Sequence, residues 1–243
     1  MLDGNLIRIP RGVCAHRRAP VLKLTPGKRA GYEGAQRVRT IWLSRPAPPT
    51  ESIFMSIASP HAGDEQIIAA TERWLERAVI GLNLCPFAKA VHVKKQVRYV
   101  VSNATTPEAL LETLMDELQA LSDADPGQID TTLLIHPFVL TDFADYNEFL
   151  DVADAAVEDM QLDGELQVAS FHPQYQFADT HINDIGNYTN RAPYPILHLL
   201  REDSIERAVA AFPEADDIFG KNIETMEKLG HDGWDALDVG PAK

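Results

Sequence analysis

Two histidine-proline dipeptides, His136-Pro137 and His172-Pro173, each follow a segment rich in aliphatic and aromatic residues. Because proline has no N–H to donate to a strand ladder, each dipeptide marks the end of a predicted strand. Ligands of open α/β sheets bind beyond the carboxyl ends of the strands. If the two strands are parallel neighbours, both imidazoles reach the same sheet edge, and histidine is the usual general acid or base near neutral pH. His136 and His172 are therefore candidate catalytic residues; the alternative is that each is a hydrogen-bonded structural residue at the end of its strand.

A long segment, 173–193, follows the second dipeptide and carries aromatic, amide and cationic side chains. A loop of this length inside a compact domain is usually functional or disordered, and its aromatic residues argue against disorder. The planar guanidinium of Arg191 suits a carboxylate or phosphate, although it could equally pair with an acidic side chain of the protein. We therefore expect a small anionic metabolite as ligand. The predicted substrate-binding residues are Asn103, which follows the first strand, and Tyr175, Asn187, Asn190 and Arg191.

Cys85, within GLNLCPFAKA, precedes a proline that can begin a short helical turn, and Lys89 lies one turn further on. A helix N-terminus and a nearby cation both favour a thiolate, so Cys85 is a candidate nucleophile. The alternative is a packing role, because cysteines outside disulfides are among the most buried residues. Two histidines with a cysteine or carboxylate could hold zinc, but spacing identifies no third ligand, so no metal-binding residue is assigned. His198 falls in the middle of a predicted strand and is interpreted as a core residue.

The elements that position these residues alternate between two hydrophobic periods. Apolar residues at three- and four-residue spacing predict a first helix over 64–84, and Thr106 followed by Pro107 has the composition of a second helix start. The alternation of helices and strands predicts an α/β fold, with a single mixed four-stranded sheet, βαβ crossovers and helices on one or both faces. A ferredoxin-like two-layer sandwich is the rival. The predicted strands are 96–102, 129–140, 166–172 and 194–201, a third helix starts near 145, and two helices, about 203–211 and 215–229, follow.

The charge is distributed unevenly along the 243 residues, whose net charge is −14. Residues 1–54 hold ten Lys/Arg and three Asp/Glu, whereas the remainder holds twelve and thirty-three. An acidic body argues against nucleic acid and anionic membrane surfaces as partners. Two cysteines far apart, Cys14 and Cys85, provide no disulfide framework, which favours a cytoplasmic location. Composition does not indicate an oligomeric state.

Residues 1–54 show no sustained period, and three interpretations stay open: a basic disordered extension, a targeting segment, or translation that begins at Met55. We expect a flexible lead-in over 55–63, one globular domain over 64–234 and a flexible tail over 235–243. Walker, GxGxxG, GxSxG, HExxH and CxxC motifs are absent from the sequence. The remaining hypotheses are an enzyme or binder of a small anionic metabolite, or a non-catalytic ligand- or peptide-binding regulatory module.

Four strings in order, GLNLCPFAKA, LLIHPFVL, FHPQYQFA and NYTNRAPYPILHLLRE, span much of the predicted domain. Together they resemble the domain of unknown function 1415 family, a group of small bacterial and plastid-type proteins, over about 66–234. The resemblance implies the limits of the domain and favours Met55 as the effective start. It implies no reaction.

Overall fold

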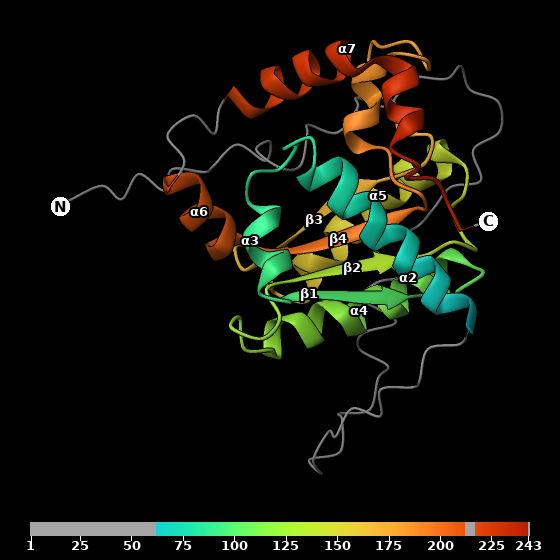
Figure 1. The fold of residues 1–243 in the computed structure, drawn as a ribbon. Coiled ribbons are helices and arrows are strands. Elements are labelled where there is room, and N and C mark those ends of the chain that lie inside the picture. Colours follow the sequence, from blue (N-terminus) through green and yellow to red (C-terminus); the bar gives the residue numbers. More distant parts are fainter. Residues whose placement is uncertain (1–61, 212–216, 243) are drawn as a thin grey trace.

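Four short strands form one mixed sheet in the computed structural model, which describes residues 62–211 and 217–242 (Figure 1). The strand order is β1-β2-β4-β3, with β1 (Val97–Val101) parallel to β2 (Thr131–Ile135). The predicted α/β fold with a mixed four-stranded sheet is thus confirmed. The interpretations of residues 1–54 fall outside the described residues, as does most of the expected lead-in.

The strands that carry the two histidine-proline dipeptides are not neighbours. β4 (Ile196–Arg201) lies between β2 and β3 (Leu166–Phe171) and runs antiparallel to both. Two antiparallel pairings in succession leave β2 and β3 running in the same direction. Their carboxyl ends therefore lie at the same sheet edge, as expected, but one strand further apart than adjacent pairing would place them.

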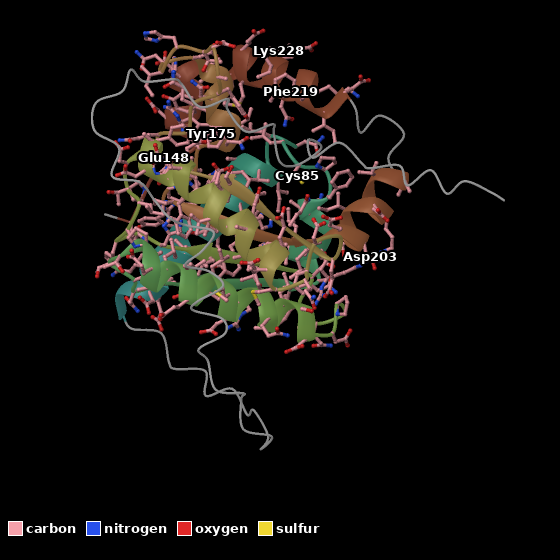
Figure 2. The ribbon with its side chains drawn as sticks, turned by 180° about the vertical axis from the view of Figure 1, so that it is seen from behind. Cys85, Glu148, Tyr175, Asp203, Phe219 and Lys228 are labelled. Atoms are coloured by element: carbon pink, nitrogen blue, oxygen red, sulfur yellow. The ribbon has the colours of Figure 1, made fainter. Side chains whose placement is uncertain are left out.

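Two helices cover one face of the sheet and enclose the larger core. α4 (Pro107–Asp123) begins at the predicted cap, where the Thr106 side chain accepts a hydrogen bond from Ala109 N–H. α5 (Phe143–Asp159) begins slightly earlier than predicted, because Asp142 rather than Asp145 accepts hydrogen bonds from the first-turn N–H groups. The two helices lie side by side in the view from behind (Figure 2). The central residues of this core are Leu110, Leu114, Leu134, Tyr146, Leu197 and Leu199.

The other face is covered by the first helical segment, which makes the arrangement three-layered rather than the rival two-layer sandwich. α2 (Ala62–Trp74) continues into the π-helical segment η1 (Leu75–Ile80), and the short helix α3 (Ala88–Val93) follows. Trp74, Leu75 and Val79 pack against strand residues of β2 and β4. A π-helical turn within a longer helix is rare and often lies at a functional site.

The C-terminal half adds three helical elements. α6 (Glu202–Ala210) follows β4 directly, and α7 (Ile218–Ala236) packs on the 3₁₀ segment η2 (Ile185–Asn190) (Figure 1). α7 is kinked at Gly230, whose φ of 64° and ψ of 178° form a backbone conformation that is essentially restricted to glycine. No helix in the described part of the chain has the length and apolarity needed to cross a membrane.

The segment after α7 returns to the first helix instead of leaving the domain. Arg73 Nε donates to the carbonyl of Asp238 over 2.8 Å, and Arg77 donates to the carbonyl of Leu237 over 2.9 Å. Val239 is buried. Residues 237–242, which the sequence placed in a tail, therefore form part of the surface next to the carboxyl ends of the strands.

Candidate functional site

His136 lies in the core directly after β2. Its Nδ1–H donates to the carbonyl of Val139 over 3.0 Å, and its Nε2 is buried without a hydrogen-bond partner among the described residues. The ring stacks on Tyr146 at 5.7 Å between centroids. Burial, assisted by the nearby His172, lowers the pKa of His136 to about 4. The imidazole is therefore neutral near pH 7.

His172, directly after β3, is buried on the same aromatic ring. Its Nε2 donates to the carbonyl of Leu140 over 3.2 Å, while Nδ1 accepts the backbone N–H of Gln174 over 3.0 Å. These two bonds require the neutral Nε2–H tautomer. Burial lowers the pKa of His172 to about 4. Its ring centroid lies 5.0 Å from that of Tyr146.

The structure thus brings the two predicted histidines together, but inside the core rather than on an open rim. Tyr146, from α5, contacts both imidazoles and donates its hydroxyl hydrogen bond to the carbonyl of Ile196 in the strand between them. The histidines bond mainly to the backbone of the loops that leave β2 and β3. This geometry fixes the paths of those loops.

The prolines of the two dipeptides, in contrast, line an open cleft of about 470 Å³ at this edge of the sheet. The ring centroids of Tyr188 and Trp234 lie 5.3 Å apart in an edge-to-face arrangement on its wall, and residues of the segment after α7 also line it. The volume lies within the range of small-molecule sites. The lining residues are Pro137, Thr141, Pro173, Tyr188, Arg191, Ala192, Pro193, Tyr194, Pro195, Trp234, Val239, Gly240 and Pro241.

Arg191 is the predicted binding residue that lines this cleft. Its guanidinium lies over the Tyr188 ring, 4.1 Å from the centroid. Nε donates to the carbonyl of Tyr175 over 3.3 Å and Nη2 to that of Ile182 over 2.7 Å. Burial lowers the pKa of Arg191, although the group stays charged, because arginine titrates far above neutral pH. Within the described residues no backbone carbonyl accepts a hydrogen bond from Nη1, and the Tyr188 side chain interacts favourably with the guanidinium.

The other predicted binding residues take structural positions. Asn187 is fully buried, accepts the N–H of Phe177 and donates to the carbonyl of His181, so it holds the long loop together from inside. Asn190 is buried and donates to the carbonyl of Ser170. Tyr175 packs its ring against neighbouring aromatic rings and is 3% exposed, and Asn103 is exposed after β1 outside the cleft lining.

Cys85 lies elsewhere, in a second cavity on the α2 face of the sheet. Cys85 is not among the residues that line the cleft at the carboxyl ends of β2 and β3. This cavity is also lined by His198 and Thr131, which contact each other, Nε2 to Oγ1, at 2.7 Å. The sequence interpretation of His198 as a core residue recognised its face but not the cavity. The alternation of Ile196, His198 and Leu200 along the strand indicates which face of the sheet His198 occupies. It does not indicate that the helices over that face leave a cavity.

No group of three or more histidine, cysteine or carboxylate side chains that could hold a metal ion occurs among the described residues. The zinc arrangement that the sequence left open, two histidines with a third ligand, therefore has no counterpart in this part of the chain. His136 and His172 instead give one ring nitrogen each to a backbone carbonyl, and the second nitrogen of His172 accepts a backbone N–H.

Comparisons with known proteins place the whole of this architecture in one family. No curated protein and no solved structure matches the chain. One family model, described as "Protein of unknown function (DUF1415)", matches residues 66–236, which include all four strands and both cavities' principal walls. The chain therefore belongs to the DUF1415 family.

Proposed function

We propose that the domain binds a small anionic metabolite in the cleft at the carboxyl ends of β2 and β3, with Arg191 as the residue that recognises the anion. The observation that carries this proposal is the restrained guanidinium of Arg191. Two backbone carbonyls and the Tyr188 ring hold its plane, and no backbone carbonyl of the described residues takes up the donors of Nη1. A cation that is already oriented loses little conformational freedom when an anion binds.

The rest of the cleft indicates what else such a ligand carries. Tyr188, Tyr194 and Trp234 contribute aromatic surface, and five prolines contribute rigid apolar surface. A ligand with a carboxylate or phosphate and a flat apolar body satisfies both the guanidinium and these rings. Aromatic carboxylates and aryl phosphates are the simplest members of that class.

Binding without catalysis fits the cleft better than the enzymatic alternative. The described lining residues include no histidine, cysteine or carboxylate that could transfer a proton near neutral pH. In the enzymatic alternative His136 and His172 are the acid and base, but neither lines the cleft, and backbone hydrogen bonds hold both ring nitrogens of His172. The volume of about 470 Å³ suits a small molecule better than an extended peptide.

Calorimetric titration of the full chain with benzoate and phenyl phosphate tests the proposal, with neutral benzamide as the control ligand. We expect the anions to bind and benzamide to bind at least tenfold more weakly, a difference of about 1.4 kcal/mol. Arg191→Met should lower anion affinity by a similar factor, whereas Arg191→Lys should retain part of it. Lys228→Met, which removes one exposed cation on α7 away from the cleft lining, should leave affinity unchanged. Equal anion affinity of Arg191→Met and the unmodified chain, at equal thermal stability, would contradict the proposal.

A further inference from the structure

The second cavity, of about 460 Å³, lies between the sheet and the elements that cover its α2 face. Leu133 and His198 of the sheet form its floor, and Leu75 and Val79 of the π-helical segment form one wall. Cys85 lies on the rim formed by the turn before α3. The cavity is distinct from the cleft at Arg191, because no residue lines both.

The lining is predominantly aliphatic and aromatic, with Phe87 and Phe171 in addition to the aliphatic residues above. Protein interiors are normally packed as densely as organic crystals. Apolar atoms that face a hollow of this size lack the dispersion contacts that packing would give them. An apolar molecule of matching size would supply those contacts and bury apolar surface from water at the same time.

Helix α6 covers this hollow without being buried itself. None of its residues is buried, yet Ile205 and Ala208, three positions apart and thus on one helix face, both line the cavity. Its first turn is held by Ser204 Oγ, which donates to Asp130 Oδ1 over 2.6 Å. Figure 1 shows α6 beside α3, away from the main helical layer of α4. A helix that places its apolar face over an apolar cavity can shield a bound apolar ligand from water.

One polar side chain on the cavity floor, His198, has a ring nitrogen that can accept a hydrogen bond from a ligand. Thr131 has a single hydroxyl proton, which it donates to the carbonyl of Leu199 over 2.6 Å. The contact between Thr131 Oγ1 and His198 Nε2 must then be a hydrogen bond donated by Nε2–H. Nδ1 of His198 consequently carries a lone pair, and no hydrogen bond from a described residue occupies it. Burial lowers the pKa of His198 to about 4, so the ring stays neutral near pH 7.

The other polar groups of the lining are engaged within the protein. Asp130 accepts from Ser204, and the guanidinium of Arg201 donates to the carbonyls of Leu121 and Ala124. An anionic ligand would lose its hydration in this cavity without an unengaged cation to meet it, and a cationic ligand would meet an apolar lining everywhere except at Asp130, which already accepts from Ser204. A neutral donor, in contrast, is matched by the lone pair of Nδ1.

We infer that this cavity binds a small uncharged molecule with an apolar body and a single hydroxyl group, which donates a hydrogen bond to Nδ1 of His198. The ligand class includes bicyclic phenols and alcohols of similar size. Residues Leu75, Val79, Phe87 and Leu133 would contact the apolar body, and Ile205 and Ala208 of α6 would cover it.

The test compares 2-naphthol with 2-methoxynaphthalene, which has the same rings but no proton to donate. Titration of the full chain should show that 2-naphthol binds at least tenfold more tightly. His198→Phe, which keeps a ring but removes both nitrogens, should abolish this difference while 2-methoxynaphthalene still binds. Bound 2-naphthol should also slow the alkylation of Cys85 by N-ethylmaleimide, followed by mass spectrometry of the peptide that contains Cys85, because the thiol lies on the rim.

A matched pair of α6 variants distinguishes binding inside the cavity from binding elsewhere on the surface. Ala208→Phe fills the cavity and should abolish binding of both naphthalenes, whereas Ala210→Phe, on the same helix but outside the lining, should leave binding unchanged. Equal affinity for the two naphthalenes in the unmodified chain overturns the inference. It is equally overturned if neither compound binds, or if Ala208→Phe and Ala210→Phe bind alike. None of these outcomes bears on the binding of benzoate at Arg191.

Discussion

The indole nitrogen of Trp74 donates a hydrogen bond to the main-chain carbonyl of Arg191 over 2.9 Å. The same indole ring lines the second cavity and packs edge-to-face on Phe171, with 5.1 Å between centroids. One buried side chain, 2% exposed, thus contacts the backbone of the cleft and the wall of the cavity. It is the direct physical connection between the two sites that we propose.

Trp74→Phe should weaken the binding of benzoate several-fold, because the carbonyl of Arg191 loses its donor and the guanidinium is then less well held. The loss of a buried hydrogen bond should also lower the free energy of unfolding by about 1–3 kcal/mol. Calorimetry and urea denaturation measure the two effects. Benzoate affinity that is unchanged by Trp74→Phe would show that Arg191 is positioned by its side-chain bonds alone.

Two buried histidines and the half-buried His198 predict a marked acid sensitivity of the fold. The pKa values of His136, His172 and His198 are each lowered to about 4, whereas an unfolded histidine titrates near 6.5. Between these values the unfolded chain binds more protons than the folded one, so stability is full above pH 6.5 and is lost as the pH falls toward 4. Urea denaturation at intervals from pH 7.5 to 4.5 should show this decline.

His136→Asn isolates the contribution of one imidazole. The asparagine amide can still donate to the carbonyl of Val139, but it does not titrate. The slope of unfolding free energy against pH should then decrease by up to about 1.4 kcal/mol per pH unit, since one fewer proton is taken up on unfolding. A slope equal to that of the unmodified chain would mean that His136 is not the neutral, buried group described above.

Asn187 should be essential for the shape of the loop that carries Arg191. Asn187→Ala leaves the N–H of Phe177 and the carbonyl of His181 without the partner that the buried amide provides, a total cost of about 1–3 kcal/mol. We expect faster limited proteolysis within 176–186 and weaker benzoate binding. Asn183→Ala, an exposed asparagine in the same loop, is the control and should change neither. Similar proteolysis of both variants would assign the order of the loop to its aromatic residues instead.

Gly81 directly follows the π-helical segment, at a position that has no room for a side chain. A Cβ at this position would lie 2.3 Å from the carbonyl oxygen of Arg77, so Gly81→Ala must distort the backbone that supports Leu75 and Val79 in the cavity wall. We expect a loss of stability of about 1–3 kcal/mol from such overpacking, together with weaker binding of 2-naphthol. Gly220→Ala in α7, where a Cβ meets nothing, should be neutral or slightly stabilising. Thermal denaturation of the two variants measures these changes in stability.

The sheet and its helices follow from local sequence signals. Thr106 and Pro107 start α4 as predicted, and the uninterrupted apolar run of β2 matches a central strand buried on both faces. The strand order does not follow from such signals, because the segment 131–135 pairs with residues 196–201 far away in sequence. Hydrophobic periodicity specifies which face of a strand is buried, but it does not specify the neighbour.

The candidate site likewise combines features that local sequence predicts with features that depend on contacts between distant segments. The sequence predicted a ligand site beside the histidine-proline dipeptides. An open cleft lies there, but the prolines line it while the imidazoles turn inward onto Tyr146. That difference depends on the rotamers that the α5 layer allows. His198 was assigned to the correct face, but the hollow above it results from how η1 and α6 pack on the sheet, which no single segment encodes.

The position of β4 has a consequence for how this chain acquires its fold. The strand that joins β2 to β3 is the last of the four to leave the ribosome, so the sheet exists only as separate pieces until residue 201 has been synthesised. Pairings between segments this distant in sequence close slowly, because a large loop entropy opposes them. Until then the inner edges of β2 and β3 lack a partner and can pair with other chains. A chain stopped before β4 is therefore expected to aggregate rather than to survive as a smaller domain.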